Sequence, residues 1–336
     1  MQSDRILLAH GSGGTMMRDL INDVFMTGFS DDILMRMDDA ASLDFPGSRL
    51  AFSTDTYVVN PLFFPGADIG RLAVCGTVND VATSGAKPLY LSVGFVLEEG
   101  FPVEDLRRIL VSMRDAAAEA GVRIVTGDTK VVEKGHGDGC YINTAGVGVL
   151  AEGLDLSGSN CQAGDVVLLS GTLGDHGIAV ISTREGLTFS TDIESDAAPL
   201  GALIAAVLAV APDTRCFRDP TRGGLASTLN ELAGASGVCI TIDETLVPVR
   251  EQVRGACEML GYDVFQVANE GKMVTVVPAS QAEAALAAMR DAPYGEDAAI
   301  IGEVAESPAG RVYVQTAFGA TRIMDMLVGE QLPRIC

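Results

Sequence analysis

The sequence has little positive charge, no tryptophan and only three histidines. Its 23 Lys and Arg residues stand against 45 Asp and Glu residues, which gives a formal net charge of −22. Such a surface repels nucleic acids and anionic membranes, so neither is an expected partner. His10, His136 and His176 show no HxxxH spacing, so we do not expect histidine to bind a metal here.

Paired cysteine motifs are also missing. The seven cysteines are odd in number and none are spaced as CxxC, so we expect neither a disulfide framework nor a structural zinc site. Six lie among apolar or small residues, where cysteine acts as a small hydrophobe. Cys336 is the last residue of the sequence, and an exposed thiolate there would be a strong nucleophile. An accidental terminal cysteine fits the pattern equally well.

Long apolar runs are absent as well. No stretch approaches eighteen consecutive apolar residues, so we expect no transmembrane helix. Residues 1–9 carry two opposite charges and only a short apolar run, which is not a secretory signal. We therefore expect a cytoplasmic protein. The P-loop pattern GxxxxGK[ST] is also absent.

The 336 residues suit two domains, in which strands and helices alternate. We expect a glycine-rich segment over 1–41, one α/β domain over 42–152, a second over 153–318 and a tail over 319–336. In the first half we expect strands at 50–59, 89–97, 122–126 and 141–150, and helices at 15–25, 68–84 and 102–120. In the second half we expect strands at 166–170, 238–242, 273–277 and 300–304, and helices at 198–210, 224–234, 249–260 and 281–291.

Acidic residues stand at the ends of several expected elements: Asp38-Asp39, Asp55, Asp80 and Asp128. Asp80 falls on the inward helical stripe that carries Ile69, and an inward carboxylate needs a partner or a cation. Several converging carboxylates suit Mg²⁺, which commonly bridges protein carboxylates to nucleotide phosphates. Taken singly, each of these residues is more often a cap or a turn residue.

Two glycine-containing segments suggest anion binding. Gly11-Ser12-Gly13-Gly14 precedes a helix, and Arg218-Asp219-Pro220-Thr221-Arg222-Gly223-Gly224 opens another. The first is also explained by a flexible turn and the second by a salt-bridged turn. Glu270 precedes a strand, and its pattern alone does not distinguish it from a solvated turn residue.

Taken together, the motifs resemble the HypE family of hydrogenase-maturation enzymes. That family belongs with aminoimidazole ribonucleotide (AIR) synthetase, selenophosphate synthetase and thiamine monophosphate kinase. The matching segments run from end to end in family order: His10-Gly11-Ser12-Gly13-Gly14, Phe52-Ser53-Thr54-Asp55, Pro61-Leu62-Phe63-Phe64-Pro65-Gly66, Gly76-Thr77-Val78-Asn79-Asp80, Gly127-Asp128-Thr129-Lys130-Val131-Val132, Ile142-Asn143-Thr144, Gly174-Asp175-His176-Gly177, Asp219-Pro220-Thr221-Arg222-Gly223-Gly224, Asn269-Glu270-Gly271-Lys272 and Pro333-Arg334-Ile335-Cys336.

The resemblance implies a two-domain PurM-like (AIR synthase-like) α/β fold with a flexible tail, and ATP-dependent dehydration of an S-carbamoyl group on Cys336 to a thiocyanate. It implies that Cys336, Glu270 and Lys130 are catalytic. ATP would be bound by Gly11, Ser12, Gly13, Gly14, Asp55, Thr56, Asn79, Asp80, Asp128 and Thr129. Mg²⁺ would be held by Asp39, Asp55, Asp80 and Asp128, with Asp38 as an alternative to Asp39.

The resemblance also implies partners. The first domains of two subunits would pair sheet to sheet in a homodimer, a HypF carbamoyltransferase would load Cys336, and a HypC–HypD complex would receive the cyanide. A tail of about ten residues spans at most roughly 35 Å, enough for Cys336 to swing between an outer and an inner position. Alternatives are another enzyme of the superfamily, such as a selenophosphate synthetase, and a non-catalytic acidic scaffold.

Overall fold

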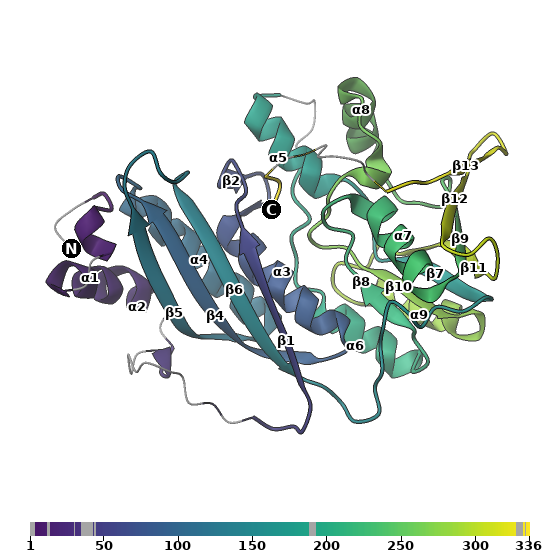
Figure 1. Ribbon diagram of the computed structural model, residues 1–336, viewed down its shortest axis with the longest axis horizontal. Helices are drawn as coiled ribbons and strands as arrows, with labels where there is room; N and C mark the ends of the chain where they lie inside the picture. Colours follow the sequence, from purple (N-terminus) through teal and green to yellow (C-terminus); the bar gives the residue numbers. More distant parts are fainter. Residues whose placement is uncertain are drawn as a thin grey trace.

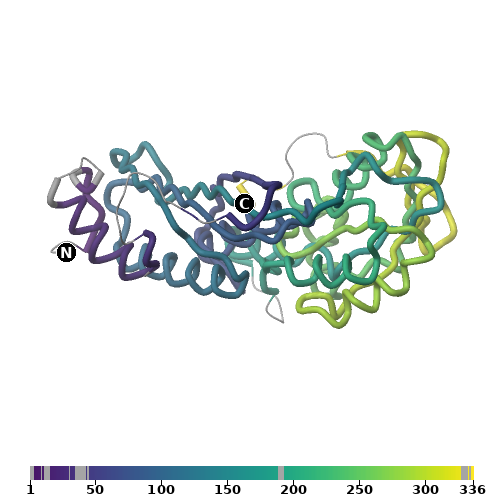
Figure 2. The backbone as a smooth tube through the Cα atoms, turned by 90° about the horizontal axis from the view of Figure 1, so that it is seen from below, coloured from purple at the N-terminus to yellow at the C-terminus, as the bar shows by residue number. Residues whose placement is uncertain are grey.

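The computed structural model describes residues 4–11, 14–29, 31–34, 43, 45–187, 193–326, 332 and 334–336. The molecule is elongated, with the first half of the chain at one end and the second half at the other (Figure 2). The C-terminus returns to the middle, where the two halves meet (Figures 1 and 2). A site between the halves can therefore receive residues from both halves and from the C-terminal segment.

The first half is built on a four-stranded sheet in the order β1-β6-β4-β5. Its strands are β1 (Leu50–Tyr57), β4 (Lys87–Glu98), β5 (Arg123–Val132) and β6 (Cys140–Val149). Helices α3 (Ile69–Thr83) and α4 (Val103–Ala120) lie on one face of this sheet (Figure 1). The opposite face, called the open face below, carries exposed side chains such as Phe52. Strand β1 forms one edge of the sheet, next to the second half.

Helix α4 follows directly from its sequence. Leu106, Ile109, Leu110 and Met113 recur at helical spacing and are fully buried against the core. Gly121 ends the helix in the left-handed conformation, with φ 69°, which glycine adopts without steric cost. The sequence predicts both features correctly.

Helix α3 is buried on almost every side because it lies between the sheet and the second half. Asp68 caps its N-terminus by accepting hydrogen bonds from the N–H groups of Gly70 and Arg71, at 2.8 and 2.9 Å. The helix therefore forms a rigid wall between the two halves.

The N-terminal segment contains η1 (Leu8–Gly11), α1 (Gly14–Leu20), a π-helical turn η2 (Ile21–Phe25) and α2 (Met26–Phe29). It packs on α4 and on β5, and the rings of Phe25 and Phe95 lie 5.3 Å apart. The expected helix over 15–25 is therefore part of a longer helical segment. A two-stranded ribbon of β2 (Phe63–Phe64) and β3 (Ala67–Asp68) precedes α3.

The second half is built on a seven-stranded sheet in the order β13-β12-β9-β11-β7-β10-β8. Residues of α7 pack on one of its faces, and residues of α6 and α9 pack in a separate core cluster with Leu168 and Val277. The strands are β7 (Asp165–Leu169), β8 (Cys216–Arg218), β9 (Cys239–Asp243), β10 (Val274–Pro278), β11 (Ala299–Ala305), β12 (Arg311–Gln315) and β13 (Thr321–Ile323). The helices are α5 (Asp175–Glu185), α6 (Gly201–Val210), α7 (Gly224–Ser236), α8 (Glu251–Leu260) and α9 (Ala282–Asp291), with short 3₁₀ turns η4 (Val264–Gln266) and η5 (Ala279–Gln281).

All strands and helices that we expected are present, although β5 continues well beyond Thr126. The sequence did not predict β2, β3, α5, β8, β12 or β13. Helix α5 begins in a glycine-rich stretch, β8 has only three residues, and β13 is exposed throughout, so these three show no clear periodic pattern. Strand β12 does alternate between buried and more exposed residues, a pattern that we overlooked in the sequence. Among the described residues, no helix is long and apolar enough to cross a membrane.

We expect Leu110→Ala to lower the free energy of unfolding by about 2–5 kcal/mol, because it leaves a cavity in the fully buried core of the first half. Urea denaturation followed by circular dichroism measures this. Val111→Ala is the matched control on the same helix, since Val111 is 42% exposed and should change stability by less than about 0.5 kcal/mol. Equal losses for both variants would contradict the assigned core.

Candidate active site

A cavity of about 510 Å³ lies between the two halves. Its walls come from the β1 edge, from α3, from the segment before α7 and α7 itself, from Glu270 and from Cys336. The lining residues are Phe52, Ser53, Thr54, Asp55, Gly76, Asp80, Thr83, Arg218, Asp219, Thr221, Arg222, Ser227, Thr228, Glu231, Glu270 and Cys336. Four of the residues singled out in the sequence, Asp55, Asp80, Glu270 and Cys336, thus meet in one place.

Asp55 and Asp80 reach the cavity from neighbouring elements. Alternation along β1 turns Ser53 and Asp55 towards α3, where the Ser53 hydroxyl donates to Asp80 Oδ2 at 2.9 Å. Burial, and then the negative charge of Asp219, raise the pKa of Asp80 to about 6. Asp55 adds to this rise. The inward position that the helical stripe predicts for Asp80 is therefore present.

This group of carboxylates has the chemistry of a cation site. The charges of Asp219 and Asp55 help to raise the pKa of Asp80, and the charge of Asp55 helps to raise that of Asp219, so a hard cation would relieve this repulsion. In the described part of the chain, however, no three His, Cys, Asp or Glu side chains are close enough to hold a metal by themselves. The donor set fits a cation that also takes ligands from a bound phosphate.

Glu270 is 4% exposed, and its Oε1 has no hydrogen-bond partner among the described residues. Burial, followed by the charges of Asp219 and Asp196, raises the pKa of Glu270 well above its ordinary value. A carboxylate with a raised pKa is a stronger base than an ordinary one. No sequence pattern selects this residue, because its burial arises only from the tertiary structure.

The main chain around Glu270 is fixed from several sides. Asp196 Oδ1 accepts a hydrogen bond from the N–H of Glu270 at 2.9 Å. Asn269 Oδ1 accepts from Gly174 N–H at 2.7 Å, and its amide donates to the carbonyl of Pro220 at 2.9 Å. A Cβ on Gly271 would lie 1.7 Å from the carbonyl oxygen of Asp196, so only glycine fits there.

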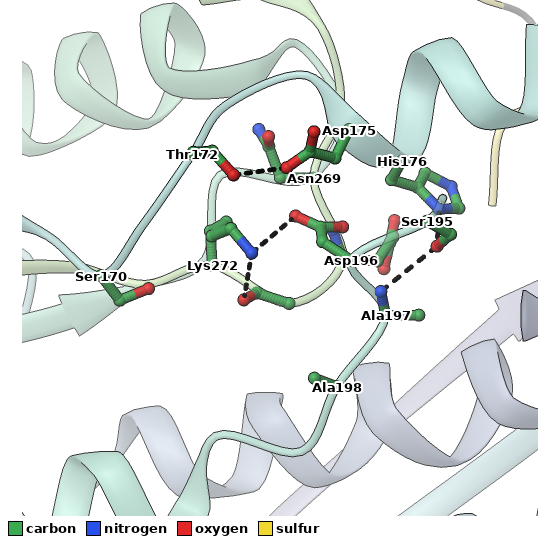
Figure 3. Close-up of polar contacts among 12 residues, drawn as sticks. Ser170, Thr172, Asp175, His176, Ser195, Asp196, Ala197, Ala198, Asn269 and Lys272 are labelled. Atoms are coloured by element: carbon green, nitrogen blue, oxygen red, sulfur yellow. Dashed lines mark hydrogen bonds and ion pairs between the residues drawn. The ribbon is translucent and has the colours of Figure 1, made fainter. Parts of the chain in front are cut away.

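A second polar cavity of about 370 Å³ is lined by Asp175, Asp196 and Lys272, among others. Figure 3 shows the polar contacts around these residues. The buried carboxylates of this cavity have cationic neighbours. Lys272 Nζ lies 3.4 Å from Asp196 Oδ2, and Arg250 Nε lies 3.6 Å from Asp175 Oδ1. The Thr172 hydroxyl donates to the other oxygen of Asp175. These contacts balance the buried charge and hold the segment that carries Glu270.

The C-terminal segment docks beside the 510 Å³ cavity. The N–H groups of Val58 and Asn60 donate to the carbonyl oxygens of Cys336 and Arg334, at 3.1 and 3.2 Å. Ile335 is 3% exposed, so its side chain anchors the segment in the core. Burial, and then the charge of Glu270, raise the pKa of the Cys336 thiol, which keeps it protonated in this position.

Other predicted residues lie on the open face, away from the cavity. Thr56, Asn143, Gly94 and Asp128 pair across the four strands in one row, so Thr56 and Asp128 lie about 14 Å apart, three strand spacings. Lys130 forms an exposed ion pair with Asp128, 2.6 Å from its Oδ2, which lowers the pKa of Asp128. The predicted site residues thus fall into two sets, on opposite faces of one sheet.

Two further residues are buried outside the cavity lining. The Asn79 amide donates to Ala198 O at 2.9 Å, and its oxygen accepts from Leu200 N–H at 2.8 Å, so it joins α3 to the second half. Thr129 is 6% exposed on β5. The predicted ATP contacts of both residues stay predictions.

The glycine patch is only partly described. Gly11 ends η1, which contacts β5, and Gly14 begins α1. Ser12, Gly13, Asp38 and Asp39 lie outside the described residues.

Sequence reasoning missed Ser53 and Thr83 and left the role of Arg218 and Arg222 open. Arg218 and Arg222 line the cavity near the N-terminus of α7, which follows Gly223 in the left-handed conformation. Two arginines beside a helix N-terminus suit an anion. The glycine-rich signal at 218–224 was present in the sequence, whereas hydroxyl residues such as Ser53 carry no signal that separates them from ordinary strand residues.

We expect Asp80→Asn to raise stability in EDTA at pH 8 by about 1–2 kcal/mol. The folded-state pKa of about 6 lies above the ordinary 3.8, so ionised Asp80 destabilises the fold as pH rises through this window. The gain should therefore vanish near pH 4. Denaturant titrations at both pH values measure it, with Asp115→Asn, at an exposed position of α4, as the control. A gain of equal size at pH 4 would show that charge is not its cause.

Two family models cover most of the chain. Residues 37–150 match the N-terminal domain, and residues 162–315 the C-terminal domain, of AIR synthase related proteins. A carbamoyl dehydratase HypE of Azotobacter vinelandii is 54% identical over all of this chain and 98% of its own length. The carbamoyl dehydratase HypE of Escherichia coli K12 is 48% identical over 99% of this chain and all of its own length.

Solved structures agree with these relatives. A crystal structure of hydrogenase maturation protein HypE in complex with ATP is 50% identical, covers 98% of this chain and 99% of its own, and has a TM-score of 0.95. A HypE–HypF complex is 52% identical, covers 92% of this chain and 99% of its own, and has a TM-score of 0.81. A thiamine-monophosphate kinase of Stenotrophomonas maltophilia, at 22% identity and a TM-score of 0.64, shares the fold alone and covers 82% of this chain and 89% of its own. The chain belongs to the HypE family of carbamoyl dehydratases, within the AIR synthase related proteins.

Proposed function

We propose that this protein uses ATP to dehydrate an S-carbamoyl group on Cys336 to a thiocyanate, which supplies the cyanide ligands of a [NiFe]-hydrogenase iron centre. The observation that carries the proposal is the docking of Cys336 in the same cavity as Glu270 and the Asp55–Asp80 pair. Family membership supports the class of reaction. No feature of the site favours a selenophosphate synthetase or a non-catalytic scaffold.

The reaction needs one phosphoryl transfer and the loss of two protons from nitrogen. The carbamoyl oxygen attacks the γ-phosphorus of ATP, ADP leaves, and one N–H proton is lost, which gives an S-bound imidate phosphate. Loss of the second N–H proton then forms the C≡N bond and expels inorganic phosphate. We assign Glu270 as the base for one of these protons, since it is buried next to Cys336 and its raised pKa favours proton uptake.

Asp55 and Asp80 are the described carboxylates that would hold Mg²⁺, and Arg218 and Arg222 would face the phosphates. Bound Mg²⁺ would offset the charge that develops in phosphoryl transfer. Asp39 and Asp128 remain proposed further ligands. An ATP complex is known for the HypE structure that is 50% identical to this chain, which supports ATP as the cosubstrate here.

A homodimer explains why the predicted site residues lie on two faces of one sheet. The cavity is lined by Ser53 and Asp55 from the helix side of β1, and also by Phe52 and Thr54 from the open face, so it continues around the β1 edge. A second subunit packed on the open face would bury the exposed Phe52 and would bring its own strands to the cavity. In that arrangement Thr56, Asp128, Lys130 and the Gly11–Gly14 patch would contribute to nucleotide binding, with Lys130 assisting catalysis. The side chain of Thr129 faces the helix side of the sheet, beside buried Phe95, so the second subunit does not account for its predicted contact.

The remaining assignments concern partners and organisation. We infer a HypF-type carbamoyltransferase as the donor, since a HypE–HypF complex is known for a close relative, and a HypC–HypD complex as the cyanide acceptor. We also propose a cytoplasmic location, domains over 42–152 and 153–318, and a C-terminal tail of which about the last ten residues move between outer and inner positions. The start of the expected tail over 319–336 does not move with them, because Thr321–Ile323 form β13 in the sheet and Met324 is buried in the core. The docked Cys336 represents the inner position.

Mass spectrometry tests the reaction. After incubation with HypF, carbamoyl phosphate and ATP, the C-terminal peptide should carry a carbamoyl group that then loses one water. We expect Glu270→Gln to form the carbamoyl adduct but to convert it at least about 100-fold more slowly, because the base is lost. Glu303→Gln, an exposed change on β11, is the control, and Cys336→Ala should carry no adduct. Normal conversion by Glu270→Gln would contradict its assigned role.

Light scattering tests the dimer. Phe52 is 67% exposed on the open face, so Phe52→Asp should place a charge in the proposed interface and halve the solution mass. Leu246→Asp, at a 50% exposed site in the second half, should leave the mass unchanged. A wild-type protein that is monomeric at micromolar concentration would refute the interface.

A further inference from the structure

His176 contacts the C-terminal segment directly, although no step of the proposed reaction uses it. It lies in the first turn of α5, is fully buried, and its Nε2 lies 2.8 Å from the carbonyl oxygen of Ile335. Its Nδ1 lies 2.9 Å from the Ser195 hydroxyl (Figure 3). The edge of the ring also packs against Phe64, with ring centroids 5.5 Å apart. The imidazole is therefore held by a hydrogen bond at each nitrogen and by its packing against the Phe64 ring.

These contacts determine the tautomer. A carbonyl oxygen only accepts hydrogen bonds, so Nε2 must carry the proton and donate it to Ile335. Nδ1 then accepts from the Ser195 hydroxyl, whose oxygen in turn accepts from Ala197 N–H at 3.2 Å. The ring is neutral in this arrangement, in agreement with burial, which lowers the pKa of His176. A continuous chain of hydrogen bonds thus runs from the Ala197 main chain to the C-terminal segment.

The other carbonyls of the segment are held differently. The carbonyls of Arg334 and Cys336 accept from the main chain of residues 58–60, in the first half of the molecule. Arg184 of α5 also donates to the Arg334 carbonyl, at 2.7 Å. The Ile335 carbonyl, which is bonded directly to the nitrogen of Cys336, is the one held by His176. Fixing that carbonyl fixes the direction in which the Cys336 side chain leaves the backbone.

We propose that His176 is a positioning residue that latches the C-terminal segment in the inner position by donating Nε2–H to the Ile335 carbonyl, which holds the Cys336 sulfur beside Glu270. The proposal rests on the proposed function and extends it to the control of tail position. His176 contacts the main chain rather than the sulfur. The latch therefore acts alike on the free thiol, the carbamoylated and the cyanated forms of Cys336.

The latch also sets the balance between loading and dehydration. Without the Nε2 donor, the Ile335 carbonyl would be buried without its partner, and the inner position would lose roughly a factor of ten in population relative to the outer one. Loading of Cys336 by an external enzyme needs the outer position, so it should proceed as fast or faster. Dehydration needs the inner position, so it should slow down. A residue with a merely structural role would slow both steps.

The test is the rate at which a maleimide labels Cys336 in the full-length protein, without ATP or partner enzyme. The other six cysteines are buried, and Cys336→Ser provides the blank. His176→Gln keeps an amide donor close to the Nε2 position, whereas His176→Asn, of similar polarity, is too short to reach Ile335. We expect His176→Asn to be labelled roughly tenfold faster than wild type and His176→Gln to restore most of the protection.

Three outcomes would overturn the latch. The first is a labelling rate of His176→Asn equal to that of wild type, and the second is an equally fast rate in His176→Asn and His176→Gln. The third is fast labelling accompanied by a similar fall in the melting temperature of both variants, which would show that general destabilisation exposes Cys336. Ser195→Ala provides a second variant, outside α5, which should give faster labelling by releasing Nδ1. If His176→Asn does not fold, unchanged protection in Ser195→Ala refutes the proposal.

A second measurement separates this proposal from the proposed function. After carbamoyl loading, His176→Asn should convert the adduct with ATP roughly tenfold more slowly while it loads at least as fast as wild type. If labelling responds as expected but no variant, wild type included, dehydrates the adduct, the latch stands and the proposed function fails. If wild type dehydrates the adduct and His176→Asn does so at the same rate, the latch fails.

Discussion

The site depends on one buried contact, the hydrogen bond from the Glu270 N–H to the Asp196 carboxylate. A carboxyl group with no partner for one oxygen is costly to bury, and it keeps its place only if its backbone cannot relax. Asp196 provides that restraint and is itself neutralised by Lys272. The ion pairs of the 370 Å³ cavity thus stabilise the wall of the 510 Å³ cavity. They hold the main chain of Glu270 in place, so its side chain can face Cys336 although Oε1 has no hydrogen-bond partner among the described residues.

The same segment joins the two halves of the molecule. Asn79 on α3 bonds to the main chain of Ala198 and Leu200, just beyond Asp196. Any shift of α3 therefore reaches both the Asp80 carboxylate, one residue further along the helix, and the strand-like segment that restrains Glu270. Asp80, proposed to lie near the nucleotide phosphates, and Glu270, proposed as the base, are in this way held in one rigid frame. This frame explains why residues remote in sequence arrive in the cavity in a fixed relation.

The sequence predicted the parts of this site that local periodicity determines. The helical stripe placed Asp80 inward, as the structure has it. Asp55 and Asp128 were expected at the ends of elements and instead lie within β1 and β5. Periodicity says nothing about Glu270, whose burial depends on residues far away in the chain, such as Asp196, 74 positions before it, and family resemblance alone selected it. Nor does it show that Asp128 and Lys130 lie on the face opposite Asp55, since that separation depends on strand order. Short exposed β13 and the glycine-led helix α5 escaped prediction because tertiary contacts, not propensity, form them.

The docking of the C-terminal segment has a consequence for its strength. Residues 334–336 bind through main-chain oxygens, in the manner of a strand added to an edge, and through the buried side chain of Ile335. The Arg334 guanidinium adds a hydrogen bond to the Val58 carbonyl at 3.1 Å and an ion pair with Asp138. Because the segment is tethered, it acts as an intramolecular ligand whose effective concentration is of millimolar order. Its intrinsic affinity for the groove can therefore be weak and the docked form still predominate. A weakly held segment of this kind dissociates often, so a second enzyme can bind the undocked segment repeatedly. In the absence of that enzyme the docked form still predominates.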